Sequence, residues 1–146
     1  MSRFVLDCSV GISWFMPDET NDDAEAILAF LGEGSEAIVP SIFWLEIVNV
    51  LLVAERRNRI GEEDVTEALA MLSALRILVD ANTVQQSTGA TLELARQYRL
   101  AAYDAAYLEL ALREELPLAT IDNRLAEAAR DCGVFMEIPT LGDIEF

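Results

Sequence analysis

Residues 3–7 read RFVLD and residues 118–122 read LATID, so two short apolar runs each end in an aspartate. Runs of this kind predict strands that are buried in a sheet. In open α/β sheets, ligands bind outside the carboxyl ends of the strands, at the point where the strand order reverses. Asp7 and Asp122 are therefore candidates to flank such a point, although an aspartate can also cap the helix that follows it.

Further strands and helices alternate along the chain. The other segments that predict strands are 37–39, 76–79 and 135–138. Helices are predicted over 21–31, 40–58, 62–75, 83–99, 103–115 and 123–131, with a loop or short turn over 9–15. This alternation is typical of a mainly parallel sheet with helices on both faces. We therefore expect residues 1–146 to form a single three-layer α/β domain.

The ionisable side chains are unusual in kind as well as in number. The chain has 26 acidic and 10 basic residues; all of the basic ones are arginine, and histidine and lysine are absent. Without an imidazole there is no Ser-His-Asp or Cys-His pair, and no zinc or copper site that needs histidine. Without lysine there is no P-loop and no Schiff base. Carboxylates, hydroxyls, arginines and two thiols are left to perform any catalysis.

The net charge of −16 argues against a protein that simply coats nucleic acid, because such proteins carry a basic footprint. The charge can also serve solubility alone. The longest apolar run, residues 42–54, is too short to span a bilayer, and the N-terminus lacks the apolar core of a signal peptide. We therefore expect a cytoplasmic protein with no membrane partner, in which Cys8 and Cys132 are reduced thiols.

Two further acids stand among apolar neighbours. Glu46 lies within IFWLEIVNVLLVA (42–54), and burying its carboxylate needs an arginine, a set of hydrogen-bond donors or a cation. Asn49 lies three residues further on the same helix face, where it could orient Glu46 or cap a carbonyl of its own helix. Asp104 lies in AAYDAAYLELAL (101–112), whose alanines and tyrosines favour a packed helix start over a solvated one.

If Asp7, Glu46, Asp104 and Asp122 converge, they form an all-oxygen site. Mg²⁺ and Mn²⁺ prefer such sites. A divalent cation relieves the mutual repulsion of the carboxylates and attracts a phosphate. It also lowers the pKa of a bound water, which can then attack phosphorus. The predicted reaction class is therefore metal-assisted phosphodiester hydrolysis. Dehalogenase-type phosphatases and response-regulator receivers need a lysine that the chain lacks. The only G-x-G, residues 32–34, closes a helix, so we expect no nucleotide cofactor.

Four segments resemble motifs of PIN-domain ribonucleases and, among these, of the VapC-like toxins of type II toxin–antitoxin systems. The segments are FVLDCSVGISWFMPDE (4–19), WLEIVNVL (44–51), YDAAYLELA (103–111) and LATIDNRL (118–125). The resemblance covers essentially the whole chain and implies a five-stranded parallel sheet in the order 3-2-1-4-5. It also implies that the four acids bind Mg²⁺ or Mn²⁺, with Asp7 and Asp104 as the most direct ligands and Glu46 and Asp122 completing the cluster.

Further expectations follow from the same resemblance. Ser9 and Thr120 match the small hydroxyl residues that lie near the first and fourth acids of the family, where they position a carboxylate or a phosphate. Family toxins dimerise, and a cognate antitoxin inserts an arginine or a bulky side chain into the acidic pocket. The resemblance therefore implies an RNA substrate, a homodimer and an antitoxin partner.

The one local basic cluster consists of Arg56, Arg57 and Arg59. It follows the helix predicted to carry Glu46, so it could contact RNA phosphates or an acidic segment of a partner protein. The same arginines could instead only complement the negative end of the helix dipole.

Two hypotheses of different classes are consistent with these observations. The first is a Mg²⁺- or Mn²⁺-dependent endoribonuclease that acts as the toxin of a toxin–antitoxin module. The second is a catalytically weak PIN-fold interaction module whose acidic surface binds a basic protein partner. A phosphatase or a DNA-directed nuclease would use the same ions as the first.

Overall fold

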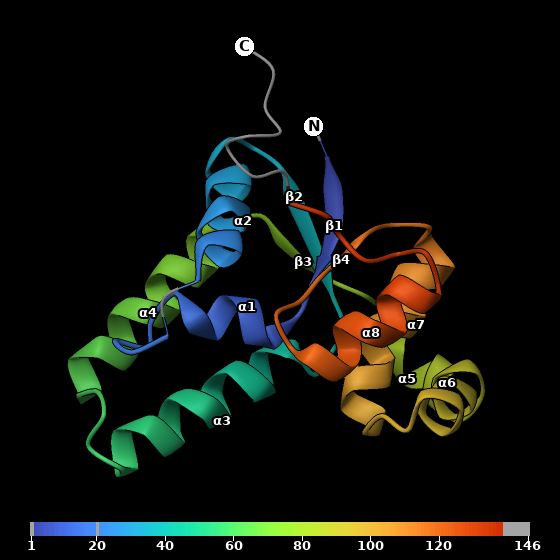
Figure 1. Cartoon of the computed structure of the whole chain (residues 1–146). Coiled ribbons are helices and arrows are strands. Elements are labelled where there is room, and N and C mark those ends of the chain that lie inside the picture. The colour runs from blue at the N-terminus through green and yellow to red at the C-terminus, as the bar shows by residue number, and fades with distance from the viewer. Residues whose placement is uncertain (1, 20, 139–146) are drawn as a thin grey trace.

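The structure, a computed structural model, describes residues 2–19 and 21–138 and consists of one sheet flanked by helices (Figure 1). The strands are β1 (Arg3–Leu6), β2 (Glu36–Val39), β3 (Ile77–Val79) and β4 (Leu118–Ala119). The helices are α1 (Cys8–Ser13), α2 (Asp22–Gly32), α3 (Phe43–Arg56), α4 (Glu62–Ala74), α5 (Thr83–Ser87), α6 (Ala90–Tyr98), α7 (Ala102–Glu114) and α8 (Asn123–Asp131). Within the described ranges, no helix has the length and apolarity needed to cross a membrane.

The sheet is parallel, in the order β3-β2-β1-β4. This agrees with the predicted order of the first four strands, but the fifth strand predicted over 135–138 is wrong. Among the described residues, Phe135 makes only an isolated parallel bridge to Leu118. β4 has two residues, Leu118 and Ala119, and in the described part of the chain the segment 134–136 pairs only with Leu118. Residues 139–146 lie outside the described part of the chain.

Two other predicted elements differ from the structure. The loop or turn predicted over 9–15 is largely helix α1, in which Val10 and Ile12 are buried. Tertiary burial therefore outweighs the weak tendency of so short a segment to form a helix alone. The single helix predicted over 83–99 is divided into α5 and α6 at Gly89, whose φ of −121° and ψ of −101° are not helical.

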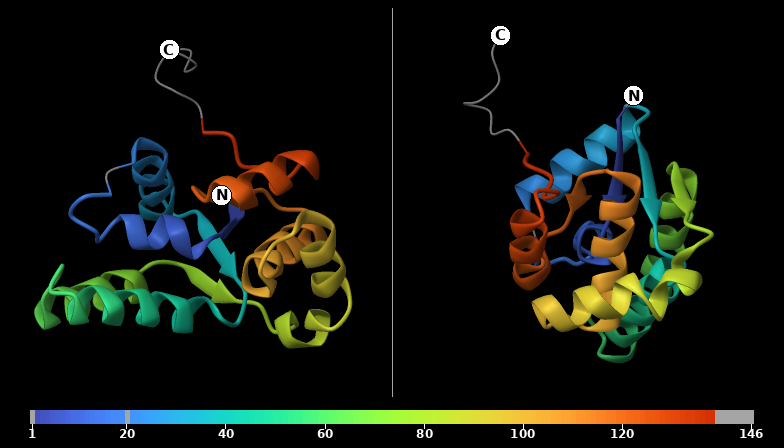
Figure 2. Two further views of the ribbon diagram at one scale, coloured as in Figure 1. Left: turned by 60° about the horizontal axis from the view of Figure 1, so that its bottom comes forward. Right: turned by 90° about the vertical axis from the view of Figure 1, so that its right-hand side faces the viewer.

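Helix α7 has the longest unbroken run of buried residues among the described helices. Every residue from 105 to 111 is buried, and the helix packs against β1, β4, α6 and α8. Figure 2 shows it between the sheet and the α5–α6 pair, while α3 and α4 run side by side on the other side of the molecule. A helix that is apolar nearly all round needs such a position. Its buried Glu109 is the exception and requires a partner.

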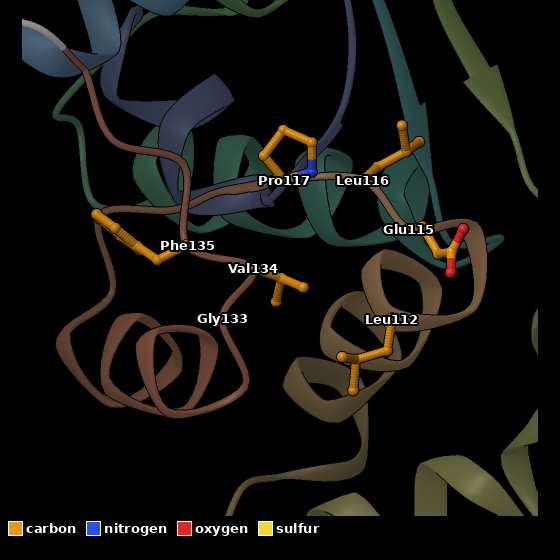
Figure 3. A pocket seen from close by; sticks show the side chains of 7 residues that line it. All are labelled: Leu112, Glu115, Leu116, Pro117, Gly133, Val134 and Phe135. Atoms are coloured by element: carbon orange, nitrogen blue, oxygen red, sulfur yellow. The ribbon is translucent and has the colours of Figure 1, made fainter.

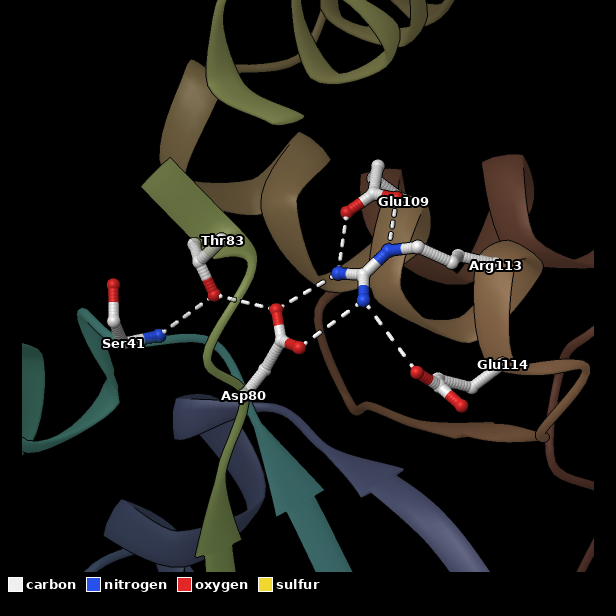
Figure 4. A network of polar contacts seen from close by, with 6 residues as sticks. All are labelled: Ser41, Asp80, Thr83, Glu109, Arg113 and Glu114. Carbon is white, nitrogen blue, oxygen red and sulfur yellow. Dashed lines mark hydrogen bonds and ion pairs between the residues drawn. The ribbon is translucent and has the colours of Figure 1, made fainter. Parts of the chain in front are cut away.

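That partner belongs to an ion-pair network that connects α7 to the sheet (Figure 4). Arg113 of α7 donates from Nη2 to Oδ2 of Asp80 at 2.7 Å and from Nε to Oε2 of Glu109 at 2.8 Å. Asp80 follows β3 and also accepts the hydroxyl of Thr83 at 2.8 Å. Thr83 in turn accepts the backbone N–H of Ser41 at 3.0 Å. Because Ser41 shortly precedes α3, the network joins the starts of α3 and α5 to α7.

The two network carboxylates are buried acids that the sequence analysis does not single out. Asp80 is 6% exposed and Glu109 is 4% exposed. Burial raises the pKa of Asp80, but hydrogen bonds from Arg113 and Thr83 outweigh it and leave the pKa below its ordinary value. The resulting stability is complete above the pKa of the unfolded chain, about 4, and is lost as the pH falls through the lower folded-state pKa.

We expect Arg113→Met to lower the free energy of unfolding by about 3 kcal/mol, because it leaves two buried carboxylates without their cation while keeping most of the apolar stem. Urea unfolding at neutral pH measures the change. The matched control is Arg96→Met, which breaks the exposed pair with Glu93 and should cost no more than about 0.5 kcal/mol. Equal losses in the two variants would show that the network contributes no more than a surface pair.

Candidate metal centre

Asp7 follows β1 at the carboxyl edge of the sheet and is 4% exposed. Its backbone N–H donates to the carbonyl oxygen of Ala119 at 3.0 Å, which extends the pairing of β1 with β4. Its Oδ2 atom accepts two hydroxyls, from Ser9 at 2.5 Å and from Thr120 at 2.8 Å. Ser9 and Thr120, the two hydroxyl residues that the family resemblance places near the acids, therefore hold this carboxylate.

The same two hydroxyl groups, of Ser9 and Thr120, also connect the segment of Asp122 to Asp7. The backbone N–H of Asp122 donates to Oγ1 of Thr120 at 3.0 Å, and the N–H of Ile121 donates to Oγ of Ser9 at 3.3 Å. The Oδ1 atom of Asp122 also accepts the N–H of Leu125 at 3.0 Å, so Asp122 caps α8. Its side chain is exposed rather than packed. Asp122 thus both caps α8 and stands at the carboxyl edge of the sheet.

Glu46 and Asp104 come from the first turns of α3 and α7. Glu46 is half-buried, and its Oε1 accepts the hydroxyl of Tyr107 at 2.7 Å. Asn49, the sequence candidate for orienting Glu46, is exposed, and no hydrogen bond joins the two in the described residues. An arginine partner, the alternative for Glu46, is likewise not found there. Asp104 is half-buried and its carboxylate does not cap α7.

Electrostatic interactions link the acids. Burial raises the pKa of Asp7 to about 6, and the charges of Asp104 and Asp122 raise it too, while the two hydroxyls lower it. Burial also raises the pKa of Glu46 to about 7, with contributions from the charges of Asp7 and Asp104. The pKa of Asp104 is raised by burial and by the charge of Asp122. Burial and neighbouring negative charge therefore destabilise the ionised forms of Asp7, Glu46 and Asp104, a condition that a cation relieves.

The donor set fits a hard divalent cation. Within the described residues, each acid keeps an oxygen that makes no hydrogen bond: Oδ1 of Asp7, Oε2 of Glu46, Oδ2 of Asp122 and both oxygens of Asp104. No buried side-chain nitrogen or oxygen in this part of the chain lacks a partner, so these oxygens are open to solvent. No three acids or thiols there are close enough to hold a metal alone. Waters and phosphate oxygens would complete the coordination, as is usual for Mg²⁺.

Comparisons with known proteins identify the family and a similar fold. The model of the PIN domain family matches residues 4–131. The chain belongs to the PIN domain family. Ribonuclease VapC3 of Pyrobaculum aerophilum is 25% identical over 125 residues, which cover 86% of this chain and 93% of that protein. The crystal structure of PAE2754 from Pyrobaculum aerophilum has a similar fold, with a TM-score of 0.62 and 18% identity over 87% of this chain and 79% of that one.

The four sequence segments indicate a PIN domain that resembles VapC-like proteins. The family match and the similarity to Ribonuclease VapC3 confirm this resemblance. In this PIN domain, Glu46 follows β2, Asp7 follows β1 and Asp122 follows β4, so neighbouring strands deliver three of the acids to one edge. Tyr107, which the sequence indicates only as part of a packed helix start, also contacts one of the acids. The residue is fully buried, and only the partner of its hydroxyl, on a different helix, distinguishes it from an ordinary core tyrosine.

The predicted basic cluster lies away from the acids. Arg56 is in the last turn of α3 and Glu46 in its first, so about 15 Å of helix separates them. Arg59 donates to Asp18 at 2.5 Å and lies 3.9 Å from Glu19. Arg56 and Arg57 are exposed and have no ion pair within the described residues. Only these two of the three arginines are free to meet a partner or a substrate.

A separate depression lies at the opposite edge of the sheet (Figure 3). Pro117 and Leu116, just before β4, form one wall, and Val134 and Phe135 form another. Its lining is mainly apolar, with Glu115 as the one ionisable side chain. The acids stand at the other end of β4, so this depression takes no part in the candidate metal centre.

Replacing Asp7 with asparagine removes a carboxyl group whose pKa is about 6 in the folded state, against an ordinary 3.8. In the wild type, the folded state binds the proton of Asp7 more tightly than the unfolded state does. In chelator, the wild type therefore loses stability as the pH rises from the ordinary pKa of 3.8 through the folded-state pKa of about 6. We expect the stability of Asp7→Asn relative to the wild type to grow by about 1–2 kcal/mol between pH 5 and pH 8.

Urea unfolding in chelator at both pH values measures this difference. Asp23→Asn serves as the control, because Asp23 is exposed in the first turn of α2. Its stability relative to the wild type should change less between pH 5 and pH 8 than that of Asp7→Asn. The proposed burial of Asp7 would be contradicted by an Asp7→Asn difference that is the same at pH 5 and pH 8.

Proposed function

We propose that this PIN domain is a Mg²⁺- or Mn²⁺-dependent endoribonuclease. The observation that carries the proposal is that four acids from four separate elements interact electrostatically, each with an oxygen open to solvent and none paired with an arginine in the described residues. Membership of the PIN family and the similarity to a protein named Ribonuclease VapC3 support RNA as the substrate. The predicted chemistry is hydrolysis of a phosphodiester bond by water.

We assign the following roles. Asp7 and Asp104 bind the cation most directly, and Glu46 and Asp122 complete the site, through water where their oxygens do not reach. When bound, the cation supplies Lewis-acid chemistry, since it neutralises charge on the phosphate and lowers the pKa of water. Ser9 and Thr120 fix the Oδ2 atom of Asp7 and leave Oδ1 as the ligand.

The biological role that we propose is that of the toxin in a type II toxin–antitoxin module. The name of the similar VapC3 protein supports a cognate antitoxin as partner. We place the protein in the cytoplasm, where its RNA substrate would be. Arg56 and Arg57 form the candidate contact for RNA or for an acidic segment of a partner, because they are exposed and unpaired in the described residues.

A second candidate function is that of an interaction module that has the PIN fold but little catalysis. The net charge of −16 favours it, because an acidic surface attracts a basic protein partner. The two functions differ in their need for metal. Calorimetry that detects no Mn²⁺ binding to the pure protein would support the module and contradict the nuclease.

We expect Asp7→Asn and Asp104→Asn each to reduce cleavage of single-stranded RNA in Mn²⁺ by at least about 100-fold, because each removes a charged oxygen ligand of the cation. A gel assay of labelled RNA measures the rate. Asp23→Asn, at the exposed start of α2, should cleave like the wild type. Cleavage that persists in excess chelator or in either site variant would contradict the assignment.

Substrate competition separates the nuclease from its closest alternatives. Single-stranded RNA should inhibit cleavage of a labelled RNA, whereas single-stranded DNA and phosphomonoesters should compete weakly. Stronger competition by DNA would indicate a DNA-directed nuclease, and hydrolysis of a phosphomonoester would indicate a phosphatase that uses the same ions.

We also propose that the protein is a homodimer, on the basis of its exposed apolar side chains. Leu45 on α3 is 74% exposed, and Val84 on α5 is 76% exposed. The bond between Ser41 and Thr83 places the starts of these two helices beside each other. Large apolar side chains grouped on a surface favour contact with another protein chain.

We therefore expect the wild type to have twice the chain mass by light scattering, and the double variant Leu45→Glu/Val84→Glu to be monomeric, because it would place charges in the contact. Leu92→Glu on α6 is the control and should stay dimeric. A monomeric wild type, or a dimer that survives the double substitution, would contradict the proposed surface.

A further inference from the structure

Tyr107 has a fully buried side chain in the middle of α7, and its hydroxyl donates to Oε1 of Glu46 at 2.7 Å. A buried phenol needs a partner for its hydroxyl, but most partners of buried polar groups are backbone or neutral groups. Here the partner is a carboxylate on a different helix, 61 residues away in the chain. The bond joins α7 to the first turn of α3.

The position of Tyr107 on α7 gives this bond its importance. Asp104 lies three residues earlier, and residues so spaced share one face of a helix. The same face of α7 therefore contributes one acid of the site and a donor to a second acid. The bond between Tyr107 and Glu46 connects the helices that carry these two acids, independently of the hydroxyls that hold Asp7.

We infer that Tyr107 is a positioning residue for the metal centre: its hydroxyl fixes Oε1 of Glu46 and leaves Oε2 as the oxygen that binds the cation. This inference rests on the proposed function, because it assumes that the four acids bind a divalent ion. A glutamate side chain loses considerable rotamer freedom when it is held in one orientation. Tyr107 removes that cost before the cation arrives, in the way that groups behind metal ligands generally do.

The test is Tyr107→Phe, which removes only the hydroxyl. We expect the affinity of the folded protein for Mn²⁺, measured by calorimetry without RNA, to fall by about 10-fold. Cleavage of RNA should be slower at limiting Mn²⁺ and should approach the wild-type kcat at saturating Mn²⁺. The KM for RNA at saturating Mn²⁺ should stay near the wild-type value, because the side chain of Tyr107 is fully buried.

Tyr98→Phe is the matched control. Tyr98 also donates its hydroxyl to a carboxylate, that of Asp131, at 2.6 Å, but on the surface between α6 and α8. Both variants lose a phenol–carboxylate bond, and only Tyr107→Phe should change Mn²⁺ affinity. If both variants bind Mn²⁺ like the wild type, Tyr107 has a structural role only and the inference is overturned, even if Tyr107→Phe unfolds at lower urea.

A second variant tests the route through Glu46. In a Glu46→Gln background, the further change Tyr107→Phe should not weaken Mn²⁺ binding again, because the ligand that Tyr107 positions is already lost. A further 10-fold loss would show that Tyr107 acts elsewhere and would overturn the inference.

These outcomes are separable from failure of the proposed function. RNA cleavage by the wild type together with unchanged Mn²⁺ affinity in Tyr107→Phe would contradict the positioning role alone. Weaker Mn²⁺ binding in Tyr107→Phe, together with no cleavage of any RNA by the wild type, would support the positioning role and contradict the ribonuclease. A wild type that binds no Mn²⁺ would contradict both.

Discussion

The parallel pairing of β1 with β4 is the constraint on which the site depends. Val5 pairs with Leu118 and Leu6 with Ala119, and the N–H of Asp7 continues the pairing beyond the strands. This register brings the hydroxyl of Thr120 to a carboxylate 113 residues away in sequence. A shift of one residue would point alternate side chains to the opposite face of the sheet and separate Asp7 from Thr120.

The buried and half-buried carboxylates of the protein are stabilised in two different ways. Asp80 and Glu109 share the guanidinium of Arg113, so their charge is largely balanced within the chain. Asp7 and Glu46 receive neutral hydroxyl groups instead, which orient a carboxylate without neutralising it. Burial of unbalanced charge is unfavourable, and the raised pKa values of Asp7 and Glu46 express this cost. Such a cost is expected where a site awaits a cation.

The sequence predicts those parts of the fold and of the candidate site that depend on neighbouring residues in the chain. The apolar runs that end in Asp7 and Asp122 predict their strands, and Glu46 is recognisable because an acid stands alone in an apolar helix. The bond from Tyr107 has no such signal, because helical periodicity places a tyrosine in the core but does not show what its hydroxyl meets on another helix. For the same reason Glu109, one turn before Arg113, resembles an ordinary exposed i,i+4 pair.

The elements that sequence mispredicts depend on tertiary context. Helix α1 is too short to form alone and is held by the burial of Val10 and Ile12. The division between α5 and α6 follows from the backbone at Gly89, which a helical pattern tolerates in sequence. The predicted fifth strand is reduced to one bridge, between Phe135 and Leu118 of the two-residue β4.

The net charge of −16 does not by itself oppose RNA at this edge. At physiological salt, charges further apart than about 8 Å are largely screened in water. The acids that open α4, Glu62 to Asp64, follow the far end of α3, about 15 Å from Glu46 along that helix. These three acids are therefore largely screened from a phosphate at the site, whereas the site's own carboxylates are not. Part of that charge is already absent at pH 7, where Glu46 titrates, and a cation would offset more of it.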